Sequence, residues 1–126
     1  MMPFIRAAAA SLALSFGLVL AIPPAARADV EDEAMQPVWL HYWMAIDAAQ
    51  YCWNVRFDGP AYDAMATVID HRVDHAIGAG PRTHLVDVAK DQTWDLVFKY
   101  GCNDPRVADL LALFRNELQP ALPPGP

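Results

Sequence analysis

The chain has 126 residues, of which 55% are hydrophobic, and a formal net charge of −6 at pH 7. This length predicts one domain with a single hydrophobic core. The acidic balance argues against nucleic acid and anionic lipid surfaces as partners, because both require an excess of Lys and Arg to neutralise phosphate. It suits a cation or a basic protein partner.

Residues 1–28 have the pattern of a secretory signal peptide. Arg6 supplies a positive start, residues 7–22 are uncharged and mostly apolar, and Ala26-Arg27-Ala28 gives the small-x-small pattern of a cleavage site. The apolar run is shorter than the roughly 20 residues that a membrane-spanning helix needs. We therefore expect cleavage after Ala28, no membrane association of the mature chain, and a periplasmic or secreted location. Cleavage removes two arginines and no acidic residue, so the net charge changes from −6 to −8.

The first predicted helix runs from Pro37 to about residue 55, after an acidic and flexible leader over residues 29–36. Proline suits a helix start, because the first turn does not need its missing N–H. Apolar residues then recur at three- and four-residue steps, as on the buried face of a helix. The residues expected on this face are Trp39, Trp43, Ile46, Trp53 and Phe57.

The second predicted helix covers residues 60–77. Asp58 is placed to cap its N-terminus, and the Gly78, Gly80 and Pro81 cluster ends it. Its predicted buried stripe consists of Tyr62, Met65, Ile69, Val73 and Ala76.

The third predicted helix covers residues 84–100, with Thr83 as its N-cap and Gly101 just beyond its end. Its inward-facing residues are expected to be Leu85, Ala89, Leu96, Val97 and Tyr100.

The fourth predicted helix starts at Asp104-Pro105 and ends at Pro120, before a Pro-rich flexible tail over residues 120–126. Its apolar face consists of Val107, Leu110, Leu111, Phe114 and Leu118. The sequence has no alternating strand pattern. It therefore predicts an all-α domain over residues 37–119, a compact bundle of four helices.

Cys52 and Cys102 are the only cysteines. In an exported chain such a pair predicts a disulfide, which would join the end of the first helix to the turn before the fourth. A catalytic redox pair would need the two cysteines close together in sequence.

Ser11 and Ser15, the only serines, lie in the signal peptide, so the mature chain has no serine nucleophile. We therefore expect a non-enzymatic binding protein.

Aspartates recur at helical spacing in two ridges. The first ridge, on the second predicted helix, is Asp63, Asp70 and Asp74, and the second, on the third predicted helix, is Asp87, Asp91 and Asp95. Like charges at this spacing destabilise a helix, and carboxylate oxygens are the ligands that hard cations prefer. The first ridge predicts a calcium or lanthanide site and the second is a weaker candidate. The alternative is a solvated acidic surface that keeps the protein soluble.

His71 and His75 are four residues apart and are a weaker candidate for zinc or copper, with Asp70 or Asp74 as a third ligand. Two carboxylates of one ridge do not complete the shell of a calcium-like ion, which takes six to eight oxygens. Water, a facing helix or a second copy of the chain has to supply the others, and the last case predicts a metal-linked homodimer.

An alternative function is a protein-binding module, a chaperone or an inhibitor. Its contact surface would be the Trp-rich first helix or the Leu110 and Phe114 face, because aromatic residues often anchor interfaces. Asp47 is a separate signal: it lies among apolar and aromatic neighbours, where a carboxylate is either paired or directed at a ligand.

Two families resemble this chain in overall character. In size, helix order and the positions of Cys52 and Cys102, it resembles the acid-stress chaperone HdeA, which implies a periplasmic chaperone. In size, acidity and lack of an EF-hand loop, with the two aspartate ridges, it looks like the exported lanthanide-binding protein landiscernin, which implies lanthanide binding.

Overall fold

The computed structural model describes the backbone of residues 24–124 and the side chains of residues 32–124. Its helices are α1 (Pro24–Trp53), α2 (Gly59–Arg72), α3 (Ala79–Tyr100) and α4 (Pro105–Leu113). A π-helical turn, η1 (Phe114–Leu118), and a 3₁₀ turn, η2 (Gln119–Ala121), continue α4. The prediction of an all-α bundle of four helices is confirmed. The apolar run of the predicted signal peptide lies outside the described residues.

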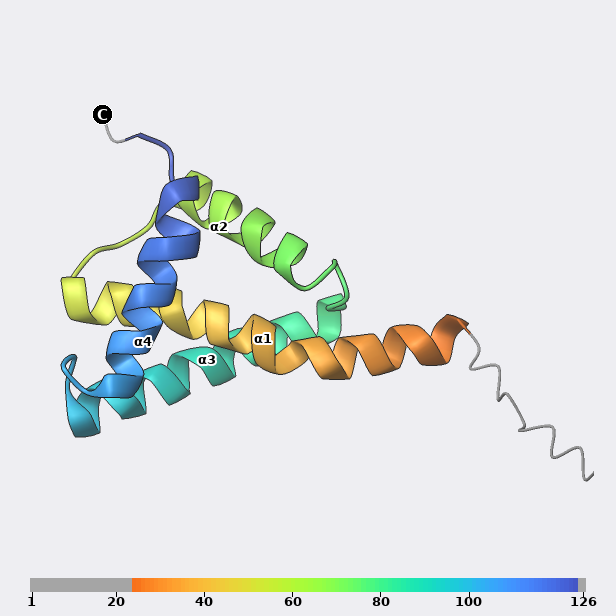
Figure 1. Ribbon diagram of the computed structural model, residues 1–126, viewed down its shortest axis with the longest axis horizontal. Coiled ribbons are helices and arrows are strands. Elements are labelled where there is room, and N and C mark those ends of the chain that lie inside the picture. The colour runs from red at the N-terminus through yellow and green to blue at the C-terminus, as the bar shows by residue number, and fades with distance from the viewer. Residues whose placement is uncertain (1–23, 125–126) are drawn as a thin grey trace, which may run out of the picture.

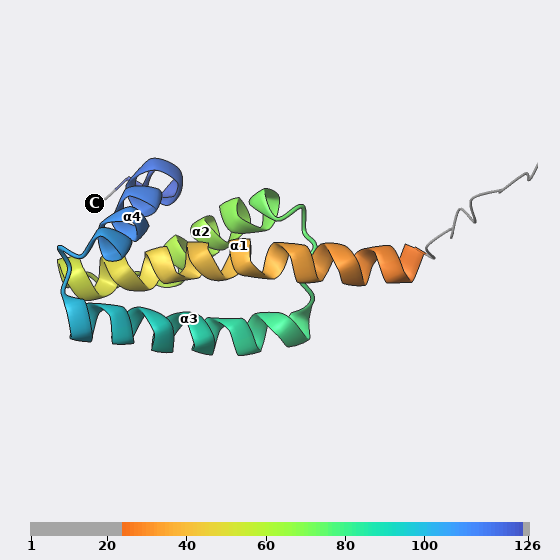
Figure 2. The same cartoon turned by 60° about the horizontal axis from the view of Figure 1, so that its bottom comes forward.

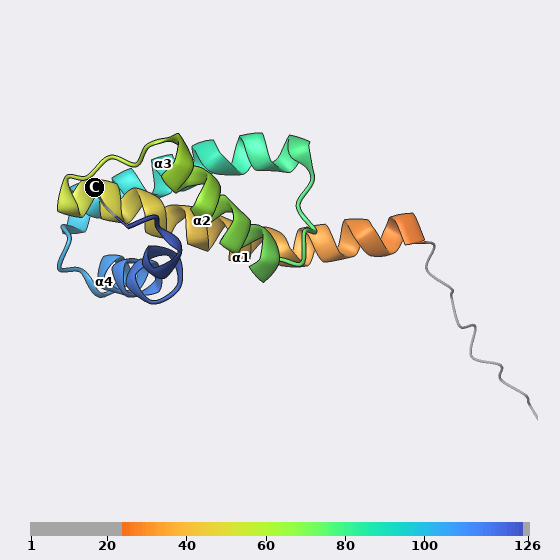
Figure 3. The same ribbon diagram turned by 90° about the horizontal axis from the view of Figure 1, so that it is seen from above.

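Helix α1 is the central element of the bundle (Figure 1). In Figure 2, α1 lies between α3, which runs in the same direction, and the pair α2 and α4. The N-terminal part of α1 extends beyond the other helices (Figure 3). Helix α3 packs on α1 and on α4, whereas its backbone does not pack against α2, to which the side chain of Arg82 forms an ion pair with Asp70. One side of α1 is therefore open between α2 and α3.

The core forms where α1 meets the apolar faces of the other helices. Ala45, Ala48 and Ala49 of α1 are fully buried, and their small side chains let neighbouring helices approach closely. The predicted stripe of α2 is confirmed at Met65, Ile69 and Val73. The whole predicted face of the fourth helix is buried, at Val107, Leu110, Leu111, Phe114 and Leu118.

The predicted helix start at Pro37 is wrong, because α1 begins at Pro24 and Pro37 lies inside it. An internal proline removes one backbone hydrogen bond and crowds the carbonyl of residue 33. Residues 29–36 contain no glycine and several good helix formers, which offset this loss. The acidic segment therefore belongs to α1.

Helix α2 ends at Arg72, five residues before the predicted end. Its end is a Schellman motif, in which His75 N donates to Asp70 O at 2.8 Å and Asp74 N donates to His71 O at 3.2 Å. Asp74 and His75 adopt left-handed φ angles of 53° and 57°. Aspartate tolerates this conformation better than most residues do, so the helix ends without a glycine.

Helix α3 begins at Ala79, so the predicted N-cap at Thr83 is also wrong. Gly78 is the N-cap, and Pro81 lies in the first turn, which does not need its N–H. At the other end Gly101 follows the helix as predicted, with a φ of 83°. Tyr100, expected to face inward, is 55% exposed and lies under the Arg106 guanidinium, 4.2 Å from the ring centre.

Two predicted N-caps are confirmed. Asp58 Oδ1 accepts a hydrogen bond from Ala61 N at 2.9 Å, and Asp104 Oδ1 accepts one from Arg106 N at 3.0 Å. Pro120, the predicted end of the fourth helix, instead lies inside the 3₁₀ turn.

The predicted disulfide joins Cys52 and Cys102, whose Cα atoms are 5.7 Å apart. It connects the end of α1 to the turn between α3 and α4. A disulfide in a small fold is compatible with an extracellular location. None of the helices in the described part of the chain is long and apolar enough to cross a membrane.

Candidate functional site

The structure does not assemble the first aspartate ridge into a cluster. Asp63 is exposed on α2, and Asp74 lies beyond the end of that helix. Asp70 pairs with Arg82, whose Nη2 and Nη1 lie 2.8 and 3.4 Å from its two carboxylate oxygens. Among the described residues no three His, Cys, Asp or Glu side chains form a group that could hold a metal ion.

The other metal candidates are also dispersed. The rings of His71 and His75 lie edge to face with centroids 5.0 Å apart, and the described part of the chain places no third ligand beside them. Asp87, Asp91 and Asp95 are exposed along α3. Hard-metal binding, alone or in a metal-linked dimer, stays a prediction that titration of metal-stripped protein with terbium would test.

The apolar face predicted for a protein partner is part of the core. Leu110 and Phe114 are only 1% and 2% exposed. Trp39 of α1 is also buried, and Trp43 and Trp53 are half-buried against the core. The large aromatic side chains at the surface belong instead to α3, where Trp94 is 52% and Phe98 76% exposed.

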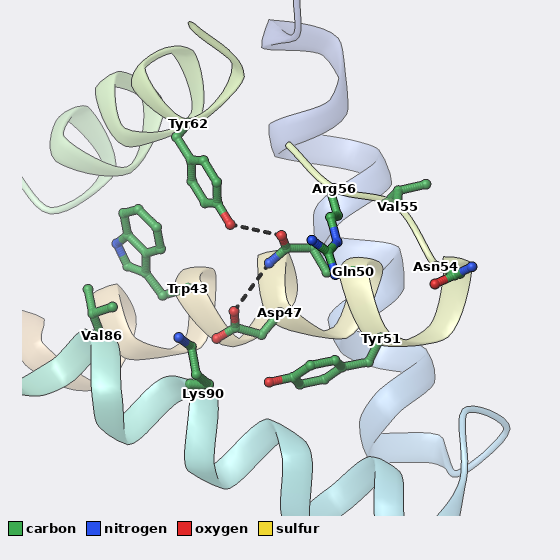
Figure 4. Close-up of a pocket in the computed structure, with 10 residues that line it drawn as sticks. All are labelled: Trp43, Asp47, Gln50, Tyr51, Asn54, Val55, Arg56, Tyr62, Val86 and Lys90. Atoms are coloured by element: carbon green, nitrogen blue, oxygen red, sulfur yellow. Dashed lines mark hydrogen bonds between the residues drawn. The ribbon is translucent and has the colours of Figure 1, made fainter. Parts of the chain in front are cut away.

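A cavity of about 580 Å³ opens beside α1, between α2 and α3. It exists because the backbones of these two helices flank α1 without packing against each other. Figure 4 shows side chains from all three helices around it. They are Trp43, Asp47, Gln50 and Tyr51 from α1, Tyr62 from α2, and Val86 and Lys90 from α3, with residues 54–56 of the α1–α2 connection at one end.

Asp47 is the buried polar group of this cavity, with 9% of its surface exposed. Gln50 Nε2 donates to Asp47 Oδ1 over 3.5 Å, which is a long hydrogen bond, and Tyr62 Oη donates to Gln50 Oε1 at 2.8 Å. The Lys90 ammonium points toward Asp47 in Figure 4, but no ion pair to Asp47 forms among the described residues. The carboxylate is therefore buried with weak compensation.

Aromatic rings form the walls beside Asp47. The rings of Trp43 and Tyr62 are nearly parallel, with centroids 6.2 Å apart and an interplanar angle of 13°. Burial raises the pKa of the Tyr62 hydroxyl, so it remains a hydrogen-bond donor at neutral pH. Trp43 Nε1 is buried without a partner among the described residues, and in Figure 4 it points away from Asp47.

Burial raises the pKa of Asp47 to about 6, although the positive charge of Lys90 opposes this shift. Between about pH 4 and pH 6 the folded protein keeps a proton that the unfolded chain has lost. The free energy of unfolding therefore decreases as the pH rises through this range. An Asp47 carboxylate at neutral pH thus destabilises the fold.

We expect Asp47→Asn to stabilise the protein by roughly 2–3 kcal/mol at about pH 8, because each pKa unit corresponds to roughly 1.4 kcal/mol. Near pH 4 the variant should match the wild type, since both then carry a neutral side chain. Urea unfolding across this pH range measures the difference. Asp91→Asn, on the exposed face of α3, is the matched control and should change neither value. Parallel pH profiles for wild type and Asp47→Asn would contradict the assignment.

The sequence indicated Asp47 but not the cavity. Its polar position within an apolar helix face was the signal, whereas Tyr62, Gln50 and Lys90 carry no pattern that places them together.

Comparison with protein-family models, with curated proteins and with solved structures found no match for this chain. A functional argument therefore depends on the geometry of the site itself.

Proposed function

We propose that this chain is an exported, non-enzymatic binding protein that takes a small organic amine into the Asp47 cavity. The observation that carries the proposal is the buried carboxylate of Asp47, which has one long hydrogen bond and, among residues 32–124, no ion pair at the wall of an open cavity. A buried charge without a partner is destabilising, and a titratable group perturbed by burial beside an open cavity is a candidate ligand-binding group.

The cavity suits an ammonium group better than a metal ion. It offers one carboxylate, whereas calcium-like ions take six to eight oxygen ligands. The rings of Trp43, Tyr51 and Tyr62 add a surface that attracts organic cations through cation–π interactions. Its volume of about 580 Å³ lies within the usual range of small-molecule sites.

Two cationic side chains of the lining, Lys90 and Arg56, oppose the binding of an amine and would favour an anion. Both side chains are exposed, so solvent weakens their repulsion of an incoming ammonium. The absence of a free cysteine supports a binding role over a thiol-based enzyme, because both cysteines are in the disulfide. The predicted signal peptide and this disulfide support export to the periplasm or the medium.

The test compares phenethylamine with phenylacetate, which share a ring and carry opposite charges. In calorimetric titrations we expect the amine alone to bind, with affinity that increases as the pH rises through about 6 and Asp47 ionises. Asp47→Asn should weaken binding at least about tenfold, which is the effect of losing about 1.4 kcal/mol. Lys90→Gln should strengthen it, because one of the two cations that line the cavity is removed.

Asp91→Asn provides the control, since it removes a carboxylate outside the cavity and should leave the affinity unchanged. Tighter binding of phenylacetate, weakened by Lys90→Gln, would contradict the proposal and assign the cavity to anions. Equal affinity of wild type and Asp47→Asn for the amine would also contradict it.

A further inference from the structure

The outer face of α3 exposes two large aromatic side chains that lie outside the core of the bundle. Trp94 is 52% and Phe98 76% exposed. Helix α3 packs on α1 and on α4, and in Figure 2 the side of α3 away from α1 has no helix over it. Large apolar side chains gathered on an open surface mark interaction sites in soluble proteins.

These rings form an ordered row. The ring of Trp94 meets Tyr51 edge to face at a centroid distance of 5.4 Å, and it stacks on Phe98 at 5.9 Å with an interplanar angle of 23°. Each contact restricts the orientation of Trp94. Because the Trp94 ring is already restricted in the free protein, less side-chain entropy is lost when a partner packs against it, which favours affinity.

Carboxylates lie along the same face as the rings. Asp91 precedes Trp94 by three residues, and Asp95 precedes Phe98 by three, so helical spacing puts all four on one side of α3. Asp87 lies one turn before Asp91 and is exposed like the other two. None of the three takes part in an ion pair within residues 32–124. We name the surface of Asp87, Asp91, Trp94, Asp95 and Phe98 the acidic-aromatic face.

We infer that the acidic-aromatic face docks a basic amphipathic helix of another protein. The apolar side of such a helix covers Trp94 and Phe98, and its Lys or Arg residues pair with the three carboxylates. The face extends over three turns, roughly 16 Å, which matches a helix lying alongside α3. Two copies of this chain would bring like charges together, and anionic membranes or nucleic acid would be repelled.

The test uses a fluorescent amphipathic peptide of about 14 residues, built from Lys and Leu at helical spacing, and a matched peptide with Glu in place of Lys. In anisotropy titrations the purified protein should bind the Lys peptide and not the Glu peptide. The double variant Trp94→Ala/Phe98→Ala should weaken binding about tenfold or more, as expected for anchor residues. Asp91→Asn/Asp95→Asn should weaken it similarly at low salt and reduce its salt dependence.

Two controls separate this face from a general effect of charge or aromatic content. Asp63→Asn/Asp109→Asn makes the same charge change on exposed positions of α2 and α4, and Tyr100→Ala removes an exposed ring outside the face. Both should bind like the wild type. Equal losses in the controls, unchanged binding in Trp94→Ala/Phe98→Ala, or no binding of the Lys peptide would overturn the inference. Binding of the same face to anionic vesicles would overturn it too.

Discussion

Replacing Cys52 and Cys102 together with serine is expected to lower the free energy of unfolding by about 4 kcal/mol. The disulfide spans a sequence separation of 50 residues, and the loop it closes contains the whole of α2 and α3. Closing a loop of this length restricts the unfolded chain, which on the loop-entropy estimate stabilises the folded state by about 4 kcal/mol. That is a large part of the 5 to 15 kcal/mol typical of a folded domain.

Denaturant unfolding of the oxidised wild type and of the double variant measures the difference. Wild type unfolded in a reducing agent should agree with the serine variant, because it lacks the same bond. The protein isolated from its native compartment should show no free thiol when denatured. A stability loss below about 1 kcal/mol would show that the bridge contributes little beyond the packing around it.

Phe114→Ala is expected to lower the free energy of unfolding by about 3 to 5 kcal/mol, the usual range for a large aromatic residue removed from a core. Phe114 is 2% exposed, and it packs edge to face against Trp53 and stacks on Phe57, each at a centroid distance of 5.5 Å. It therefore joins α1, the α1–α2 connection and the end of α4. Its loss leaves a cavity at the meeting point of three segments.

Phe98→Ala is the matched control, because it is the same chemical change at a side chain that is 76% exposed. Urea unfolding should show a small effect for Phe98→Ala and the large one for Phe114→Ala. Comparable effects in both variants would contradict the division between the core and the acidic-aromatic face.

Helix starts with strong local chemistry could be predicted from the sequence. Asp58 and Asp104, each followed closely by proline, cap α2 and α4 where they were expected to. Less local features could not be predicted. The end of α2 depends on Asp74 in a left-handed conformation, whereas Gly78 and Pro81 gave a stronger but misleading stop signal. Pro37 was equally misleading, because it is tolerated inside α1.

The candidate site shows the same limit. Asp47 could be singled out because a carboxylate interrupts an apolar helix face. The cavity around it could not, because it depends on the backbones of α2 and α3 flanking α1 without packing against each other, which no local pattern encodes. Trp94 and Phe98 were not placed at the surface, since aromatic residues at helical spacing are usually core and their exposure depends on which side of α3 remains open.

The disulfide also changes the path by which the oxidised chain folds. Trp53 directly follows Cys52, and Phe114 lies only about a dozen residues beyond Cys102. Trp53 and Phe114 are in contact, although they are far apart in sequence. The disulfide brings the two residues close together along the cross-linked chain, so their contact becomes nearly local. Folding slows when it depends on contacts between residues far apart in sequence. In the oxidised chain, α1 can therefore pack on the end of α4 before α2 and α3 are packed. In the reduced chain, the contact between Trp53 and Phe114 has to close a long loop.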